Sequence, residues 1–233
     1  ESLWIIREGL DVKVDNVRNF QKEFDRLIER LEQNNERGKR LFLHSCCAPC
    51  SSYVLEYLRG WFNITVFYYN PNISFTEEYK KRVAEQKRLI EAYNCRDDGY
   101  PIEIVEGDYE PERFYDLAKG LEECPEGGER CFLCYEMRLQ KTAELAHAGA
   151  YDYFATTLTI SPLKNAKKLN EIGEQLAKEY GISWLVSDFK KKNGYKRSIE
   201  LSAQYDLYRQ DYCGCIYSKQ EREKQKAERK CEA

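Results

Sequence analysis

Short apolar runs alternate with helix-like segments along most of this 233-residue chain. The runs are rich in β-branched and aromatic residues and cover residues 40–44, 64–69, 102–105, 152–155 and 183–186. Segments with helical spacing or helix-boundary signals cover residues 13–35, 51–59, 76–93, 110–121, 131–148 and 165–180. Strands separated by helices of about ten or more residues pair in parallel, with right-handed crossovers. The sequence therefore predicts an α/β fold, a Rossmann-like parallel sheet of about five strands flanked by helices.

The alternation divides the chain into three predicted parts. We expect an N-terminal helical extension in residues 1–40, the Rossmann-like α/β domain in 41–187, and a helical C-terminal region in 188–233. The alternation stops after Ser187, and residues 221–230 are almost entirely charged, which predicts a polar, basic tail. The sequence contains no run of eighteen apolar residues, so we expect no membrane-spanning helix.

Ten cysteines are the unusual feature of the composition, and most of them fall in tight groups. They occupy positions 46, 47, 50, 95, 124, 131, 134, 213, 215 and 231. Their content is below that of a secreted disulfide scaffold. Tight groups in a chain without a visible secretion signal favour metal or redox chemistry over structural cross-links. We therefore expect the reducing cytoplasm as its compartment, with no role for Cys95 or Cys231 and an open role for Cys124.

The first group comprises Cys46, Cys47 and Cys50, where the first strand gives way to a helix. Ligands of open parallel sheets bind at the carboxyl ends of the strands, and a helix N-terminus lowers the pKa of a nearby thiol. Three thiols in one turn are an unusual choice for core packing. His44 directly precedes this group, and it is either a ligand, a proton donor or, as is more common, a structural residue.

The second group is the Cys-x-x-Cys pair formed by Cys131 and Cys134 at the start of a helix. Together with Cys46 and Cys47, this pair makes a set of four thiolates. Four thiolates suit either tetrahedral zinc or an iron–sulfur cluster. The position of the first pair at the presumed ligand-binding edge favours a reactive cluster over a structural zinc ion.

The third group is Cys213-Gly-Cys215. Two cysteines separated by one glycine can close a small disulfide ring, and strain makes a disulfide easier to reduce. Such a ring suits a two-electron relay. Two metal ligands or two thiols without a function remain alternatives for this pair.

Charge is unevenly distributed along the chain, although the net charge is only −3. Residues 97–129 contain twelve acidic side chains and two basic ones, whereas residues 188–197 contain five bases and one acid. The bases and Tyr195 of the second segment suit phosphates and unstacked nucleobases, although such runs are also common on solvated surfaces. These candidates are Lys190, Lys191, Lys192, Tyr195, Lys196 and Arg197. Lys164 ends a polar segment after the fourth predicted strand and is a further candidate for a phosphate or a ribose.

These groups belong to five longer motifs. They are Cys-Cys-Ala-Pro-Cys, Arg-Cys-x-x-Cys-Tyr-x-x-Arg-Leu, Thr-Leu-x-x-Ser-Pro-x-Lys, Asp-Phe-Lys-Lys-x-x-Gly-Tyr-x-Arg-Ser and Tyr-Arg-Gln-x-Tyr-Cys-Gly-Cys. Together they resemble the cobalamin-independent epoxyqueuosine reductase family, QueH. The resemblance extends over residues 41–218, and the combination of motifs is highly specific.

The resemblance implies the last step of queuosine synthesis, the reductive removal of an epoxide oxygen from the modified base. It implies a 4Fe–4S cluster held by Cys46, Cys47, Cys131 and Cys134, and a redox-active disulfide that maps onto Cys213 and Cys215. It also implies a separate iron near the cluster, for which Cys50 is the nearest candidate by position. The partners would be tRNA carrying epoxyqueuosine at the wobble position and an external electron donor. Residues 190–197 would then contact the phosphates of the anticodon arm, with Tyr195 as a stacking partner.

Three other classes of protein are alternatives to this reductase family. An ATP-dependent tRNA-modifying enzyme of the PP-loop type needs a glycine-rich phosphate loop after the first strand, but residues 44–50 contain no glycine. A zinc-stabilised tRNA-binding protein remains open and is distinguished by metal analysis. A simple thiol–disulfide oxidoreductase would not require two further groups of thiols.

Overall fold

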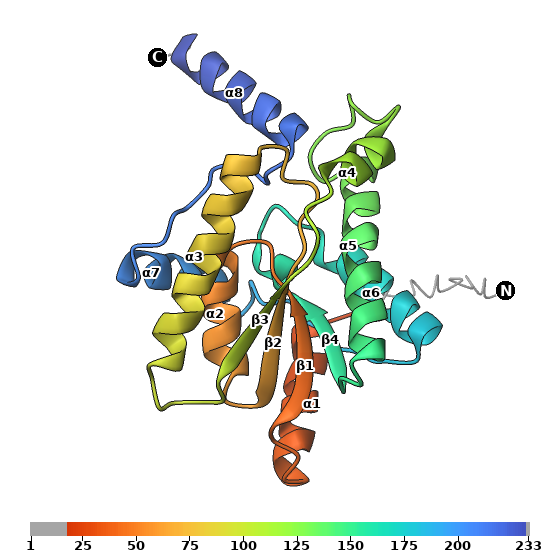
Figure 1. Cartoon of the computed structure of the whole chain (residues 1–233), viewed down its shortest axis with the longest axis vertical. Helices are drawn as coiled ribbons and strands as arrows, with labels where there is room; N and C mark the ends of the chain where they lie inside the picture. Colours follow the sequence, from red (N-terminus) through yellow and green to blue (C-terminus); the bar gives the residue numbers. More distant parts are fainter. Residues whose placement is uncertain (1–17, 232–233) are drawn as a thin grey trace, which may run out of the picture.

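The computed structural model describes residues 18–231 and has an α/β architecture (Figure 1). Five parallel strands form one sheet in the order β3-β2-β1-β4-β5. The strands are β1 (Lys39–His44), β2 (Phe62–Tyr68), β3 (Ile102–Glu106), β4 (Tyr153–Thr156) and β5 (Ser183–Trp184). The predicted Rossmann-like parallel sheet is thereby confirmed.

Helices cover both faces of the sheet. They are α1 (Phe20–Gln33), α2 (Ala48–Leu58), α3 (Thr76–Asn94), α4 (Pro111–Ala118), α5 (Glu129–Ala148), α6 (Ala166–Tyr180), α7 (Gly194–Gln204) and α8 (Ile216–Cys231), with the short 3₁₀ helix η1 (Thr157–Ile160) after β4. The core on one face is formed by α1, α2 and α3, and the core on the other face by α5 and α6. Within residues 18–231, no helix has the length and apolar character needed to cross a membrane.

Successive residues of β1 supply the two cores alternately. Leu41 and Leu43 belong to the first core, whereas Phe42 belongs to the second, because neighbouring side chains of a strand point to opposite faces. All three are nearly inaccessible to solvent, which explains why this strand is a continuous apolar run in the sequence.

The strand order reverses direction between β1 and β4. The chain proceeds from β1 through β2 to β3 on one side, and β4 and β5 then add on the other side of β1. His44 and Thr156 are paired at the carboxyl ends of the two central strands. The loops that follow these strands diverge, and ligands of doubly wound sheets bind in the crevice formed there.

Two predicted segments at the ends of the domain differ from the observed elements. The strand predicted over 183–186 pairs only through Ser183–Trp184, because the backbone N–H of Ser187 donates to the Asn170 side chain and the chain leaves the sheet. The helix predicted over 13–35 is observed from Phe20 to Gln33, with Asn19 as its N-cap. Residues 13–17 of that prediction lie outside the described residues.

The predicted helical C-terminal portion after Ser187 is confirmed. It contains α7 and α8, separated by residues 205–215, which form a connection without regular structure. In Figure 1, α7 lies beside α2, whereas α8 extends away from the sheet. The connection carries Cys213 and Cys215 across the carboxyl edge of the sheet, which a continuous helix would not do.

The contact between α6 and β5 provides a test of this packing. Gly173 lies against the Trp184 ring, and an added Cβ would come within 2.3 Å of it. Overpacking of this kind costs about 1–3 kcal/mol, so we expect Gly173→Ala to lower the free energy of unfolding by that amount in urea denaturation. Gly60→Ala is the control, because nothing lies within 4 Å of the added atom and we expect a change within about 0.5 kcal/mol. Equal free energies for the two variants would contradict the described packing.

Candidate metal and redox site

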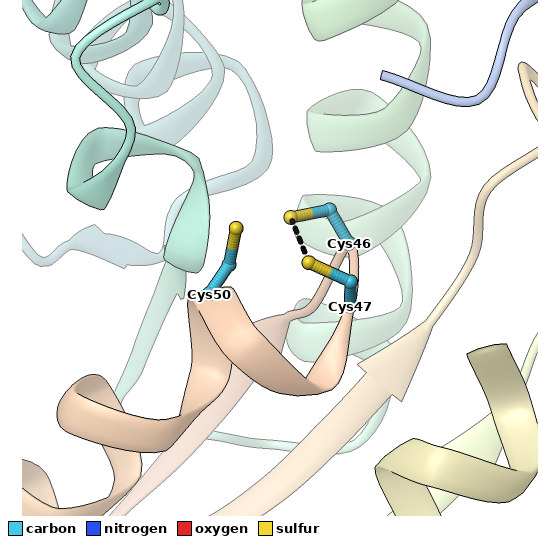
Figure 2. A group of neighbouring side chains, drawn as sticks. All are labelled: Cys46, Cys47 and Cys50. Atoms are coloured by element: carbon cyan, nitrogen blue, oxygen red, sulfur yellow. Dashed lines mark hydrogen bonds between the residues drawn. The ribbon is translucent and has the colours of Figure 1, made fainter. Parts of the chain in front are cut away.

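Three thiols converge directly after β1. The Sγ atoms of Cys46, Cys47 and Cys50, the thiol triad, all lie within 4.8 Å of one another (Figure 2). Cys46 and Cys47 are 3.8 Å apart, Cys47 occupies the N-cap position of α2, and Cys50 lies in its first turn. Such a separation suits sulfur ligands that share one metal ion or face one cluster.

A polar network fixes the loop that carries the thiol triad. The hydroxyls of Ser45 and Ser51 lie 2.6 Å apart, and both reach Oε1 of Gln86 on α3, at 2.7 and 2.9 Å. The side-chain amide of Asn70 donates to the carbonyl of Ser45 at 2.8 Å. All four side chains are buried, so the loop enters α2 in one arrangement.

The three thiols of the triad differ in how readily they ionise. Contacts with the thiols of Cys46 and Cys50 lower the pKa of Cys47 well below the ordinary value. The same contact with Cys47 raises the pKa of Cys46 to about 11, and the pKa of Cys50 is also raised. Cys47 is therefore the thiol of the triad that ionises most readily, and the thiolate is the form of cysteine that binds metals.

His44 is a structural residue in this arrangement. Its Nε2 lies 3.1 Å from the carbonyl of Tyr69 and must donate to it, so Nδ1 accepts from the hydroxyl of Thr156 at 2.9 Å. Burial lowers the pKa of the imidazole to about 3. A neutral His44 with both ring nitrogens bonded ties the ends of β1 and β4 to the loop after β2.

The second pair of cysteines lies at the start of α5. The backbone N–H of Gly127 donates to Sγ of Cys131 at 3.3 Å, and burial raises the pKa of Cys134 to about 11. Both thiols line a small inner cavity of about 10 Å³ together with Cys213 and Cys215. The second and third groups of cysteines thus meet in space although about eighty residues separate them.

Cys213 and Cys215 are free thiols in this structure. The backbone N–H of Cys213 donates to Ser218 Oγ at 3.0 Å, and the N–H of Ser218 donates to Cys215 Sγ at 3.3 Å. Gly214 between them has a backbone φ of +124°, a value that residues with a Cβ atom rarely adopt. Burial raises the pKa of Cys215 to about 12. The bonds to Ser218 hold the 213–215 loop in place, and its two thiols are not joined by a disulfide.

An outer cavity of about 200 Å³ adjoins the inner one. Cys46, Cys50 and Lys164 line the outer cavity, and Cys213 and Glu126 line both. The structure therefore places all three groups of cysteines at one edge of the sheet. Within the described residues, the thiol triad is the group close enough to share a single ion, and the set of four formed by residues 46, 47, 131 and 134 stays a prediction.

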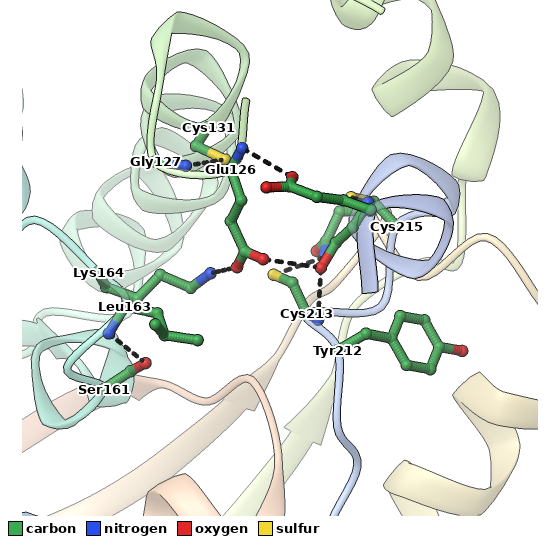
Figure 3. A network of polar contacts seen from close by, with 12 residues as sticks. Glu126, Gly127, Cys131, Ser161, Leu163, Lys164, Tyr212, Cys213 and Cys215 are labelled. Atoms are coloured by element: carbon green, nitrogen blue, oxygen red, sulfur yellow. Dashed lines mark hydrogen bonds and ion pairs between the residues drawn. The ribbon is translucent and has the colours of Figure 1, made fainter. Parts of the chain in front are cut away.

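Glu126, which lines both cavities, forms a buried ion pair with Lys164. Lys164 Nζ lies 2.8 Å from Glu126 Oε1, and Ser218 Oγ donates to Glu126 Oε2 at 3.0 Å (Figure 3). Lys164 is thus buried beside Cys213 rather than displayed on the surface. The sequence did not single out Glu126, because it is one of twelve acids in an acidic segment and no spacing marks it.

The predicted basic segment is partly neutralised by one carboxylate of its own and by two from distant helices. Lys190 pairs with Asp188 at 2.6 Å, Lys192 with Asp25 at 2.7 Å, and Arg197 with Glu56 at 2.8 Å. Lys191 and Lys196 are exposed, and no acid within residues 18–229 forms an ion pair with either. Tyr195 lines the outer cavity.

Gly214 allows the geometry of the 213–215 loop to be tested. A Cβ there would lie 2.9 Å from Ile73 and 3.2 Å from Arg82, in a strained backbone conformation that costs about 1–3 kcal/mol. We expect Gly214→Ala to raise the alkylation rate of buried Cys215 about tenfold in the metal-free, reduced protein, measured by mass spectrometry. Gly120→Ala is the control, since its φ is also positive but no atom lies within 4 Å. An unchanged rate for Gly214→Ala would refute the described loop.

Comparison with known proteins agrees with this geometry. The family model described as epoxyqueuosine reductase QueH matches residues 41–221. The chain is 43% identical over 202 residues to the epoxyqueuosine reductase QueH of Staphylococcus epidermidis, covering 86% of this chain and 84% of that protein. It is 42% identical to the Streptococcus pyogenes protein of that name, covering 86% and 79%, and 32% identical to that of Thermotoga maritima, covering 81% and 94%. The chain therefore belongs to the epoxyqueuosine reductase QueH family.

Proposed function

We propose that this protein reduces epoxyqueuosine in tRNA to queuosine. The observation that carries the proposal is the convergence of three separate groups of cysteines on two adjoining cavities at the carboxyl edge of the sheet. Membership of the QueH family supports the choice of substrate. Removal of an epoxide oxygen to leave an alkene consumes two electrons and two protons and releases water.

The proposed cofactor is a 4Fe–4S cluster bound by Cys46, Cys47, Cys131 and Cys134. The donor set fits such a group, because the four thiols come from two neighbouring segments and lie among buried positive charges, Arg138 above all. Cys50 faces the outer cavity from the thiol triad and is the proposed ligand of one adjacent iron. When bound, the cluster supplies single electrons and the iron a Lewis acid for the epoxide oxygen.

The Cys213–Cys215 pair is the proposed source of the two electrons. Oxidation of the two thiols to a disulfide releases two electrons and two protons, which balances cleavage of both C–O bonds of the epoxide and formation of water. An external reductant, a dithiol or a one-electron carrier, then restores the thiols. Support comes from the position of Cys213, which lines both cavities and thus lies between the presumed cluster and the substrate space.

The tRNA is proposed to approach along the segment that follows β5. Lys190, Lys191 and Lys192 line a surface groove of about 710 Å³ that also contains Lys164, and Lys164 lines the outer cavity as well. A phosphate backbone in the groove would place an extruded base near Tyr195 and Tyr212, whose rings border the outer cavity. We propose Lys164 as a positioning residue of the cavity rather than a backbone contact, because it is buried against Glu126.

Anaerobic assay on tRNA carrying epoxyqueuosine tests the reductase proposal. The reconstituted chain with a chemical reductant should convert the modified nucleoside to queuosine, measured by mass analysis of the digested tRNA. Cys131→Ser should abolish both the broad brown absorbance and this conversion, since it removes a proposed iron ligand. Cys95→Ser should retain both, because Cys95 is exposed and lies outside both cavities. One equivalent of zinc with no iron or sulfide, together with unreduced tRNA, would favour a zinc-stabilised tRNA-binding protein instead.

The salt dependence of tRNA binding tests the proposed groove. Each phosphate contact contributes about one unit to the slope of log affinity against log salt concentration. We expect Lys191→Ala, which removes an exposed lysine of the groove, to reduce the slope by about 1, measured by filter binding at several salt concentrations. Lys178→Ala, at the far end of α6 from the groove, should leave the slope unchanged. Equal slopes for all variants would exclude this face from phosphate contact.

A further inference from the structure

One buried guanidinium of the site has no carboxylate partner. Arg138 lies on α5 with 1% of its surface exposed and lines the inner cavity together with Cys134 and Cys213. Its Nε donates to the carbonyl of Cys134 at 3.1 Å, and Nη1 reaches Asn70 Oδ1 at 3.4 Å. Its Nη2 is fully buried and has no hydrogen-bond partner in the described structure.

Three other buried arginines of this protein are matched differently. Arg130 also lines the inner cavity without a carboxylate partner, but its Nη1 donates to the carbonyls of Leu121 and Glu122, both at 2.8 Å. Arg82 pairs with Glu78 at 2.7 Å, and Arg59 pairs with Asp98 at 3.3 Å and donates to three backbone carbonyls. Within residues 18–229, no Asp or Glu forms such a pair with Arg138. A buried cation without an anion costs several kcal/mol, so an anion is required beside Arg138.

The surroundings of Arg138 identify the kind of anion. Burial opposes its charge, yet the thiols of Cys134, Cys213 and Cys46 raise its pKa above the ordinary value. These three sulfurs come from α5, from the 213–215 loop and from the thiol triad. Arg138 is therefore close to all three groups of cysteines and, unlike Lys164, has no glutamate partner.

Sulfur surrounds the inner cavity that Arg138 lines. Cys131, Cys134, Cys213 and Cys215 all border this cavity together with Arg138. Thiolate sulfur is therefore the anion that the described residues can supply beside this cation.

We propose that Arg138 is the counter-cation of the thiolate-bound cluster and that it raises the reduction potential of that cluster. The inference rests on the cluster of the proposed function. Adding an electron increases the negative charge next to the unpartnered Nη2, and a buried cation at that place stabilises the reduced form more than the oxidised form. Arg138 thus acts as a positioning residue that makes reduction of the cluster easier.

Redox titration of the full-length, anaerobically reconstituted protein tests this role, with electron paramagnetic resonance as the readout. We expect Arg138→Met to shift the reduction equilibrium at least tenfold toward the oxidised form, which is about 59 mV for one electron. Arg138→Lys, which keeps the charge but loses the planar fork, should recover part of that shift. Arg59→Met is the control, since it removes a buried arginine that lines neither cavity, and its midpoint potential should equal that of the wild type.

A second readout separates this role from a structural one. In the metal-free protein the charge of Arg138 has no carboxylate partner, so we expect Arg138→Met to unfold at the same or a higher urea concentration than the wild type. If the Arg138→Met variant does not fold, the Arg138→Gln variant takes its place in both measurements. An unchanged midpoint potential in either neutral variant, or a metal-free protein that is strongly destabilised, would overturn the proposal. Failure of the wild type to take up iron and sulfide would instead refute the proposed cluster.

Discussion

The arrangement of the cysteines depends on the reversal of strand order between β1 and β4. This reversal opens the carboxyl edge of the sheet at its centre, where the loop after β1 carries the thiol triad. The buried network of Ser45, Ser51 and Gln86 fixes that loop, and neutral His44 joins it to the end of β4. Cys131 and Cys213 reach the same edge from α5 and from the connection before α8. Without this crevice the three groups of thiols would remain separate.

Buried positive charges around the cysteine sulfurs are the second feature of the site. Several basic side chains are buried around the sulfurs, among them Arg82, Arg138 and Lys164. Arg82 and Lys164 are each paired with a glutamate, whereas Arg138 faces thiols alone. The buried positive charges favour thiolates once these thiols bind a metal, whereas burial raises the pKa of Cys134 and Cys215 in the metal-free protein. The two cavities thus differ in purpose: the inner one suits bound sulfur, and the outer one has room for part of a substrate.

The periodicity of the sequence was sufficient to predict the sheet, since short runs rich in apolar and aromatic residues alternate with helical segments. The close contact among residues 46, 47 and 50 also followed from their spacing at a strand end. Glu126 and Arg138 were not predicted, because their importance arises from neighbours that are distant in the sequence. The charges of residues 190–197 were visible, but their neutralisation by Asp25 and Glu56 was not, since those acids lie on α1 and α2. The early end of β5 depends likewise on Asn170, a residue of α6 that accepts from the backbone of Ser187.

The central claim is that cysteines from distant segments enclose one iron–sulfur cluster at this edge of the sheet. Iron X-ray absorption of the anaerobically reconstituted chain tests it most directly, because the fine structure reports the atoms around each iron. We expect sulfur neighbours together with iron–iron scattering, both lost when Cys46 and Cys134 are replaced by serine. Sulfur neighbours without iron–iron scattering, or a signal unaffected by Cys134→Ser, would contradict it.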